Sequence, residues 1–411
     1  GEGGGGYNGA GALTLIEGGV EKNSGQNGGG IYNEGTLRIL DTNGIENSYI
    51  RYNFANAEGG GIATGGNGVT FLQYVNISEN EAGANGGGIA EQSEHLTIIN
   101  SSISYNRAER FGGGIYITVN TVEIYRSLIA ENEARKTPPS PLESYGGGLY
   151  ITGNSEVYLT STTVSSNRAD NNGGGIYINN PQSELTLTFS TVAFNASSQT
   201  ISTGTGGGIE VAQGSATLYN SLLGGNTAGL DGHNTCTGTI NLNGNNVIET
   251  NDSGCNEATP EASDIIGTPD FNIGGLQNNG AVNNSGDFLL THRLLENSVA
   301  INNGSCTNIP AALLTNSGNF PSPDYDIDGR NAIVFDQRGQ ERGYNPNPAS
   351  PGYEAHQCDS GAFETFVPVI RWEWPDVPDE GDPNPVQPSS TFIGDDPPAS
   401  FWLPETPREF G

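Results

Sequence analysis

The sequence of 411 residues contains no methionine, only two lysines and only four cysteines. Acidic residues outnumber basic ones by 46 to 15, which gives a formal net charge of −31. Nucleic acids and anionic membranes bind through clustered Lys and Arg, so neither is expected as a partner. No apolar run approaches the ~20 residues that a membrane-spanning helix requires. The missing methionine indicates a mature form from which a signal peptide has been removed.

The four cysteines contain no CxxC pair, so a zinc site is not expected. They are Cys236, Cys255, Cys306 and Cys358. Four cysteines allow three disulfide connectivities, and proximity in the chain favours 236 with 255 and 306 with 358. Disulfides form in oxidising compartments, which predicts a secreted protein located outside the cell or on its surface.

Glycine, by contrast, is abundant, with 62 residues, and much of it stands in a repeat. Glycine triplets start at positions 28, 59, 86, 112, 146, 173 and 206, with a precursor at Gly4, and an apolar residue follows each triplet. A phosphate-binding loop needs its glycines once, before a GK[ST] sequence and a helix, which is absent here. Recurring triplets therefore indicate corners. An asparagine follows about 20 residues after each triplet starts, at Asn23, Asn53, Asn80, Asn106, Asn132, Asn167, Asn195 and Asn226.

Aliphatic residues stand three and eight positions before each of these asparagines, and the stretches between them alternate with the period of a strand. A unit of about 26 residues with three short strands and three corners is typical of one coil of a parallel β-helix. Coils stacked ~4.8 Å apart place equivalent side chains on top of one another. We therefore predict an all-β fold and a structural ladder of asparagines that includes Asn80, Asn106, Asn132 and Asn167.

Two insertions fall at the same corner of the predicted coil. The gap from asparagine to the next triplet is usually six residues, but it is 14 after Asn132 and 11 after Asn195. Residues 133–145 and 196–205 are therefore expected to project from one edge, either as binding loops or as tolerated surface loops. A lesser insertion at 41–48 lies on a different side of its coil.

After residue 230 the repeat decays, and the sequence contains GLQNNGAVNN at 275–284, THRLLENSVAINNGSC at 291–306, DQRG at 336–339 and CDSGAFE at 358–364. In order and spacing these motifs resemble the closing region of bacterial choice-of-anchor Q surface proteins. The GGGIY coils are also similar to repeats of chlamydial polymorphic outer-membrane proteins. The resemblance covers about residues 1–365 and implies a right-handed β-helix exported to the bacterial cell surface.

The expected organisation is a β-helix over 1–230, an irregular disulfide-bearing cap or continuation over 231–365, and an extended tail over 366–411. The tail holds ten of the 22 prolines and all three tryptophans, Trp372, Trp374 and Trp402. Proline-rich acidic segments act as spacers, but tryptophan is a favoured interface anchor, so we assign these three residues to assembly.

One motif offers metal chemistry. Asp324, Asp326 and Asp328, followed by Gly329, match the D-x-D-x-D-G start of a calcium loop. The twelfth position is Phe335 rather than the usual glutamate. These three carboxylates are a candidate calcium site, with a solvated acidic turn as the alternative, and no other cofactor is expected.

The leading functional hypothesis is a secreted structural protein that assembles head to tail into an extracellular filament or surface layer. The first coil-like unit starts at Gly1 without a capping segment, and an open β-helix end exposes backbone groups that invite stacking on another chain. In this hypothesis the tail of one subunit docks on the next, so the partner is the protein itself.

The second hypothesis is a monomeric cell-surface adhesin that binds glycan or protein through residues 133–145 and 196–205. The third is a polysaccharide-degrading enzyme, since β-helices also host such enzymes. A glycosidase requires paired carboxylates, and the coils show no column of clustered acids. Structural roles are expected for the four scattered histidines, and we predict no catalytic site. These histidines are His95, His233, His292 and His356.

Overall fold

The computed structural model describes residues 1–41, 48–118, 121–136, 143–197, 204–229, 235–249, 255–258, 260–268, 271–279, 289–306, 336–338 and 357–363. All regular elements in these ranges are strands, which confirms the predicted all-β class. The described part of the chain contains no helix that could cross a bilayer. The chain separates into two units, Gly1–Glu364 and Thr365–Gly411, and the second unit lies outside the described residues.

The coils up to β24 (Arg168–Ala169) contain four short strands rather than the three predicted, and the two coils that start at Gly173 and Gly206 contain three. In the coil that starts at Gly86 the four strands are β13 (Ile89–Glu91), β14 (His95–Ile99), β15 (Ser102–Ser104) and β16 (Arg107–Ala108). The extra strand arises because a short turn after β13 divides the first side of the coil into two strands of one sheet. The β-branched residues in these strands favour extended backbone.

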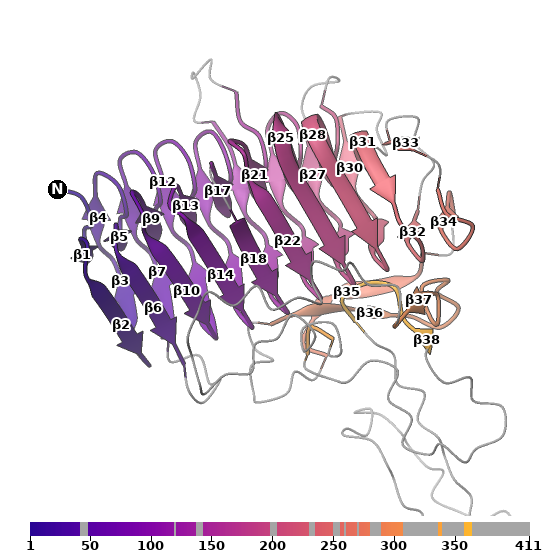
Figure 1. Cartoon of the computed structure of the whole chain (residues 1–411), viewed down its shortest axis with the longest axis horizontal. Coiled ribbons are helices and arrows are strands. Elements are labelled where there is room, and N and C mark those ends of the chain that lie inside the picture. The colour runs from indigo at the N-terminus through magenta and orange to yellow at the C-terminus, as the bar shows by residue number, and fades with distance from the viewer. Residues whose placement is uncertain are drawn as a thin grey trace, which may run out of the picture. The chain divides into compact units, whose positions relative to one another are not determined.

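Equivalent strands of successive coils pair in parallel and form three sheets, as Figure 1 shows. The first sheet has 16 strands and contains two strands from each early coil, which merge into one long strand in β25 and β28. Its members are β1 (Gly6–Asn8), β2 (Ala12–Ile16), β5 (Ile31–Asn33), β6 (Thr36–Leu40), β9 (Ile62–Thr64), β10 (Val69–Gln73), β13, β14, β17 (Ile115–Ile117), β18 (Thr121–Tyr125), β21 (Leu149–Ile151), β22 (Glu156–Thr160), β25 (Ile176–Thr188), β28 (Ile209–Tyr219), β31 (Cys236–Leu242) and β33 (Cys255–Ala258).

The other two sheets close the coil. The second sheet has ten strands: β3 (Gly19–Glu21), β7 (Ser48–Arg51), β11 (Val75–Ser78), β15, β19 (Leu128–Ala130), β23 (Thr163–Ser165), β26 (Thr191–Ala193), β29 (Leu222–Gly224), β32 (Val247–Ile248) and β34 (Ile265–Ile266). The third has eight, one per coil: β4 (Ser24–Gly25), β8 (Phe54–Ala55), β12 (Glu81–Ala82), β16, β20 (Glu133–Ala134), β24 (Arg168–Ala169), β27 (Ala196–Ser197) and β30 (Thr227–Ala228). This is the predicted parallel β-helix.

The core is a set of columns that run through the coils. Ile98 pairs with Leu72 on one side and with Ile124 on the other, and all three are completely buried. Burial of each such side chain stabilises the fold by roughly 1.5–3 kcal/mol. The aliphatic columns predicted three and eight positions before each asparagine therefore form the interior, and the first and second sheets continue beyond residue 230 with β31, β33, β32 and β34.

The region after the last coil folds back onto the outer face of the second sheet. It contains two antiparallel pairs, β35 (Ile273–Gln277) with β36 (Thr291–Leu294) and β37 (Gly304–Ser305) with β38 (Gln357–Cys358). Phe271 packs against Leu222, and a Cβ at Gly224 would lie 2.4 Å from its ring. At one outward register position of the second sheet, β15 has Ser102 and the next strand, β19, has Leu128. Leu128 packs against Leu289, so the apolar side chain marks the point where the C-terminal region begins to cover the sheet.

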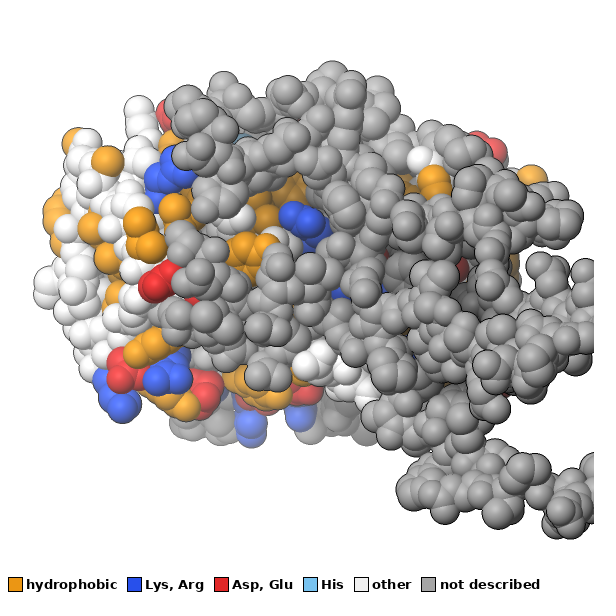
Figure 2. Space-filling model, turned by 90° about the horizontal axis from the view of Figure 1, so that it is seen from below, with side chains coloured by type: hydrophobic (Ala, Val, Ile, Leu, Met, Phe, Trp, Pro, Cys, Tyr) orange, Lys and Arg blue, Asp and Glu red, His pale blue; other side chains and the backbone are white. Residues whose placement is uncertain are grey.

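Charged side chains are few on the described surface and of mixed sign. On the side seen in Figure 2, red and blue side chains lie next to one another and to hydrophobic ones near one border. The ion pairs Arg51–Glu21 and Arg107–Glu81 join neighbouring coils, with nitrogen–oxygen distances of 2.9 and 2.8 Å. Both pairs link one coil to the next.

Candidate binding surface

Each coil turns at three corners, and one residue at each corner has a positive φ angle. At the first corner it is the first glycine of the triplet, as in Gly112 with φ of 63°. At the second it is a residue such as Arg126, with φ of 46°. At the third it is the residue directly before each ladder asparagine. That third column consists of Lys22, Tyr52, Glu79, Tyr105, Glu131, Ser166 and Phe194, with φ between 54° and 58°, and of Gly225, with φ of 65°.

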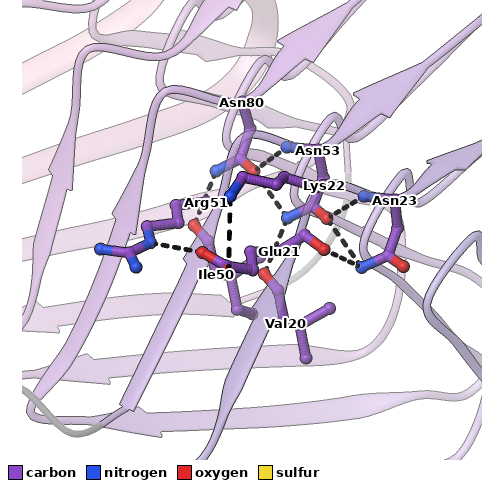
Figure 3. A network of polar contacts seen from close by, with 8 residues as sticks. All are labelled: Val20, Glu21, Lys22, Asn23, Ile50, Arg51, Asn53 and Asn80. Atoms are coloured by element: carbon purple, nitrogen blue, oxygen red, sulfur yellow. Dashed lines mark hydrogen bonds and ion pairs between the residues drawn. The ribbon is translucent and has the colours of Figure 1, made fainter.

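The asparagine ladder holds the third corner in this conformation. The backbone N–H and the side-chain Nδ2 of Asn53 both donate to Oδ1 of Asn80, over 3.0 and 2.9 Å. The same Nδ2 donates to the carbonyl oxygen of Val20 over 3.0 Å. Each amide therefore ties together three coils, as Figure 3 shows for the first coils. The pattern repeats through Asn80, Asn106, Asn132, Asn167 and Asn195 as far as Asn226, so the predicted ladder is present.

Side chains on either side of this ladder form an exposed strip that we call the corner ridge, defined by Tyr52, Phe54, Glu79, Glu81, Tyr105 and Arg107. Tyr52 is 45% exposed, Phe54 39% and Tyr105 60%. Phe54, Glu81 and Arg107 are the first residues of β8, β12 and β16 and stand in register. The ridge thus combines aromatic rings with charges of both signs on neighbouring coils.

The two tyrosines of the corner ridge line one shallow groove. Its floor and walls are completed by Glu79, Glu81 and Arg107. A hydrogen bond with the Glu79 carboxylate raises the pKa of the Tyr52 hydroxyl, and Arg107 Nη1 lies 2.8 Å from Glu81 Oε1. The groove therefore offers carboxylate acceptors, a guanidinium donor and aromatic surface within a few ångströms of one another.

The fold does not require aromatic residues at this corner. The ladder uses the backbone of each third-corner residue and the side chain of the asparagine that follows. Equivalent positions hold Lys22, Glu131 and Ser166 with the same φ. A left-handed conformation is energetically unfavourable for any residue with a Cβ, and the fold accepts side chains as different as Lys22, Ser166 and Tyr105 at this corner.

The two inserted segments leave the coil where predicted, after β20 and β27 of the third sheet. Residues 137–142 and 198–203 within them lie outside the described residues. Beside the first insertion, aromatic rings stack along the coil axis: Tyr145 lies 4.7 Å from Tyr177, and Phe111 lies 4.6 Å from Tyr150 between ring centroids. Because these rings face one another, their faces are already occupied, and we interpret the stack as a support for the edge.

His292 joins the C-terminal region to the coils. Its Nδ1 donates to the carbonyl oxygen of Gly274 over 2.8 Å, so its Nε2 accepts the hydroxyl of Ser165 at 2.7 Å. Burial lowers the pKa of His292 to about 4. A hydroxyl beside a neutral imidazole is the arrangement of a nucleophile and its base. However, Ser165 is 0% exposed and His292 3%, so a substrate has no access, and the pair is a structural clamp.

His95 is placed differently, on the outer face of β14. Its Nε2 lies 3.0 Å from Thr97 Oγ1 and 3.2 Å from Glu123 Oε2. Glu123 in turn accepts the Tyr125 hydroxyl over 3.0 Å. His233 and His356 lie outside the described residues.

The motifs that carry the family resemblance meet over the second sheet. Gln337 donates to Leu290 and bonds to Thr163, and Ala362 N donates to Thr191 Oγ1 over 2.9 Å. Arg338 Nη2 lies 2.6 Å from Asp336 Oδ2, and both residues are buried. Arg338 Nη1 also donates to a backbone carbonyl, that of Asn279.

The predicted disulfide Cys306–Cys358 is present, with Cα atoms 5.5 Å apart. Cys236 is also disulfide-bonded, and the side chain of its expected partner Cys255 lies outside the described residues. The candidate calcium ligands and the assembly tryptophans lie outside them as well: Asp324, Asp326, Asp328, Trp372, Trp374 and Trp402. Within the described ranges no three His, Cys, Asp or Glu side chains cluster as a metal site.

The corner ridge was missed by sequence reasoning, although its signal is readable. The residue before each ladder asparagine must lie at the outer corner, and in two coils out of three consecutive ones this residue is a tyrosine, Tyr52 and Tyr105. Comparison of the chain with protein-family models, with curated proteins and with solved structures finds no match.

Proposed function

We propose that this protein is an extracellular, non-catalytic binding protein of the adhesin type, in which a parallel β-helix displays the corner ridge to a surface ligand. The observation that carries the proposal is the exposure of Tyr52 and Tyr105 at left-handed corners. Bonding of Cys306 to Cys358 is consistent with an oxidising, extracellular location.

A left-handed conformation costs about 1–2 kcal/mol for a residue with a side chain. An exposed ring returns none of this through core packing, whereas tyrosine and arginine are the residues most enriched among binding hot spots. The exposure of two tyrosines beside Arg107 at such positions therefore supports recognition as their role.

The test compares binding of the purified chain to panels of immobilised glycans and extracellular-matrix polymers with that of the double variant Tyr52→Ser/Tyr105→Ser. We expect at least a tenfold loss of binding, because two aromatic contacts are removed. Tyr7→Ser is the matched control, since Tyr7 is 58% exposed but lies outside the corner ridge. Unchanged binding by the double variant, or loss of binding on deletion of 137–142 alone, would show that the binding site lies outside the corner ridge.

A second candidate function is head-to-tail assembly into a filament or surface layer. The specific observation is the first coil, where Leu13, Leu15 and Val20 are only partly buried although their equivalents in later coils are fully buried. This surface accepts a further coil, whether from a neighbouring subunit or from polypeptide upstream of Gly1. In this proposal the tryptophans of 366–411 dock on it. Sedimentation and electron microscopy test it: polymers that persist after deletion of 366–411 would contradict the role of the tail.

A further inference from the structure

We infer that the corner ridge binds an extended, uncharged polysaccharide whose chain runs along the axis of the coils. This inference rests on the proposed function, because it names the ligand class of the same surface. Its basis is the spacing, the chemistry and the charge of the groups that the ridge presents.

The spacing of the aromatic rings follows the stacking of the coils. Tyr52 and Tyr105 are two coils apart, which corresponds to about 10 Å along the axis. This is roughly the length of one disaccharide unit in an extended chain. Glu79 lies between the two tyrosines in the same groove, and Glu131 continues the alternation of ring and carboxylate. A polymer with a disaccharide period would meet an equivalent group at each repeat.

The chemistry of the groove matches a sugar ring. One face of a pyranose presents C–H groups, which pack on an aromatic face such as that of an exposed tyrosine. Sugar hydroxyls both donate and accept, so they can bond to the carboxylates of Glu79 and Glu81 and to the guanidinium of Arg107. Because hydroxyls replace water at these groups, the Arg107–Glu81 pair need not be stripped of hydrogen bonds on binding.

A protein partner fits the groove less well. Stable protein interfaces bury ~800 Å² on each partner around an apolar centre from which charged residues are depleted. Along the ridge, by contrast, the charged side chains of Glu79, Glu81 and Arg107 lie next to the rings, and Glu133 follows Arg107 on the next coil. A flat protein surface would have to desolvate these groups, whereas a narrow sugar chain leaves their other sides in water.

The charge of the ridge selects against acidic polymers. Within the corner ridge the two carboxylates of Glu79 and Glu81 outnumber the one guanidinium of Arg107, and Glu131 and Glu133 add two carboxylates on the next coil. The whole chain carries a formal net charge of −31. Polyanions are therefore repelled both locally and at long range, and an uncharged chain is favoured.

Titration calorimetry of the full chain with cellohexaose and mannohexaose, as uncharged probes, and with hexagalacturonate, as the anionic probe, tests the inference. We expect at least one uncharged probe to bind and hexagalacturonate to bind at least tenfold more weakly. Tyr105→Ala should weaken the uncharged probe about tenfold, whereas Tyr7→Ala should leave it unchanged. Circular dichroism and urea unfolding of each variant establish that the coils remain folded.

Three outcomes would overturn the inference: no binding of either uncharged probe, equal or tighter binding of hexagalacturonate, or unchanged affinity in Tyr105→Ala. The proposed function fails separately. Suppose that no oligosaccharide binds, but binding to the immobilised panels still depends on Tyr52 and Tyr105. The corner ridge is then still the binding surface, and only the inferred ligand class is wrong. If the tyrosine variants change neither assay, both proposals are wrong.

Discussion

The three glycines of each triplet are required for three different reasons. Gly112 has a φ of 63°, which favours glycine over any residue with a Cβ. A Cβ at Gly113 would lie 2.4 Å from the carbonyl carbon of Glu133 in the same coil and 2.5 Å from Gly147 O of the next. A Cβ at Gly114 would lie 3.1 Å from the side-chain amide of Asn132. The second and third glycines therefore serve close packing of backbone and ladder.

This distinction predicts the effect of adding a single methyl group. Gly113→Ala forces backbone apart and is expected to destabilise the fold by about 3 kcal/mol. Gly66→Ala is the matched control, because Gly66 has a φ of 61° but no atom near its missing Cβ. It carries only the conformational cost, about 1 kcal/mol. Urea unfolding measures both, and equal losses would contradict a packing role for Gly113.

At the scale of elements, the ladder and the sheets depend on each other. Asn106 accepts two hydrogen bonds from Asn80 and donates to Asn132 and to the carbonyl of Ile77, all at 2.9–3.0 Å. It is completely buried. The strands of the third sheet are only two residues long and make few backbone hydrogen bonds between coils. The asparagine ladder therefore supplies cohesion between neighbouring coils that these short strands do not.

Replacement of one amide tests this cohesion. Asn106→Asp places a carboxylate oxygen where the amide donated, facing the oxygens of Ile77 and Asn132, and the buried charge should destabilise the fold by about 4 kcal/mol. Asn23→Asp, at the partly exposed end of the ladder, should cost about 1 kcal/mol. Thermal unfolding at neutral pH provides the comparison. Similar losses at both positions would show that burial in the ladder is not decisive.

The ladder, the corners and the aliphatic columns could be predicted because each repeats in every coil. Single departures could not. The inward column that holds Ile117 and Ile151 in later coils holds Asn33, Thr64 and Glu91 in earlier ones. Glu91 is fully buried, which raises its pKa, and its Oε2 has no hydrogen-bond partner in the described structure. Repetition in sequence gives no warning of such an exception.

At the scale of the whole first unit, contacts far apart in sequence decide the arrangement. His292 and Ser165 are 127 residues apart, and Gln337 and Thr163 are 174 apart. The sequence motifs around 291–306, 336–339 and 358–364 indicated that these segments belong together, but not which face they cover. The outward position of the second sheet changes from Ser102 to Leu128 where this cover begins, and that signal becomes readable only when the sheet is known.

The clamp at His292 makes docking of the C-terminal region sensitive to acid. Its pKa is about 4 in the folded state and near 6.5 when unfolded, so the unfolded state binds the additional proton between these values. The stabilisation is present above pH 6.5 and is lost as pH falls, by about 2 kcal/mol between pH 7 and pH 5. Urea unfolding at the two pH values should show this loss in the native chain.

The matched variant is His292→Gln, whose amide retains a donor and an acceptor but does not titrate. It should remove most of the difference between pH 7 and pH 5. If the variant keeps the full difference in stability between pH 7 and pH 5, groups other than His292 cause that difference.

The asparagine ladder also has a direction. Each amide donates towards the following coil, so the amide dipoles add, with oxygen exposed at Asn23 and donors directed at the last coils. At that far end Gly225 N donates to the Glu249 carboxylate, and a parallel column ends with Asn246 donating to Asp264 at 2.9 Å. Lys22 lies beside the oxygen end. The stack is therefore polar, with unlike ends, and any coil placed before Asn23 would have to offer hydrogen-bond donors to its amide oxygen.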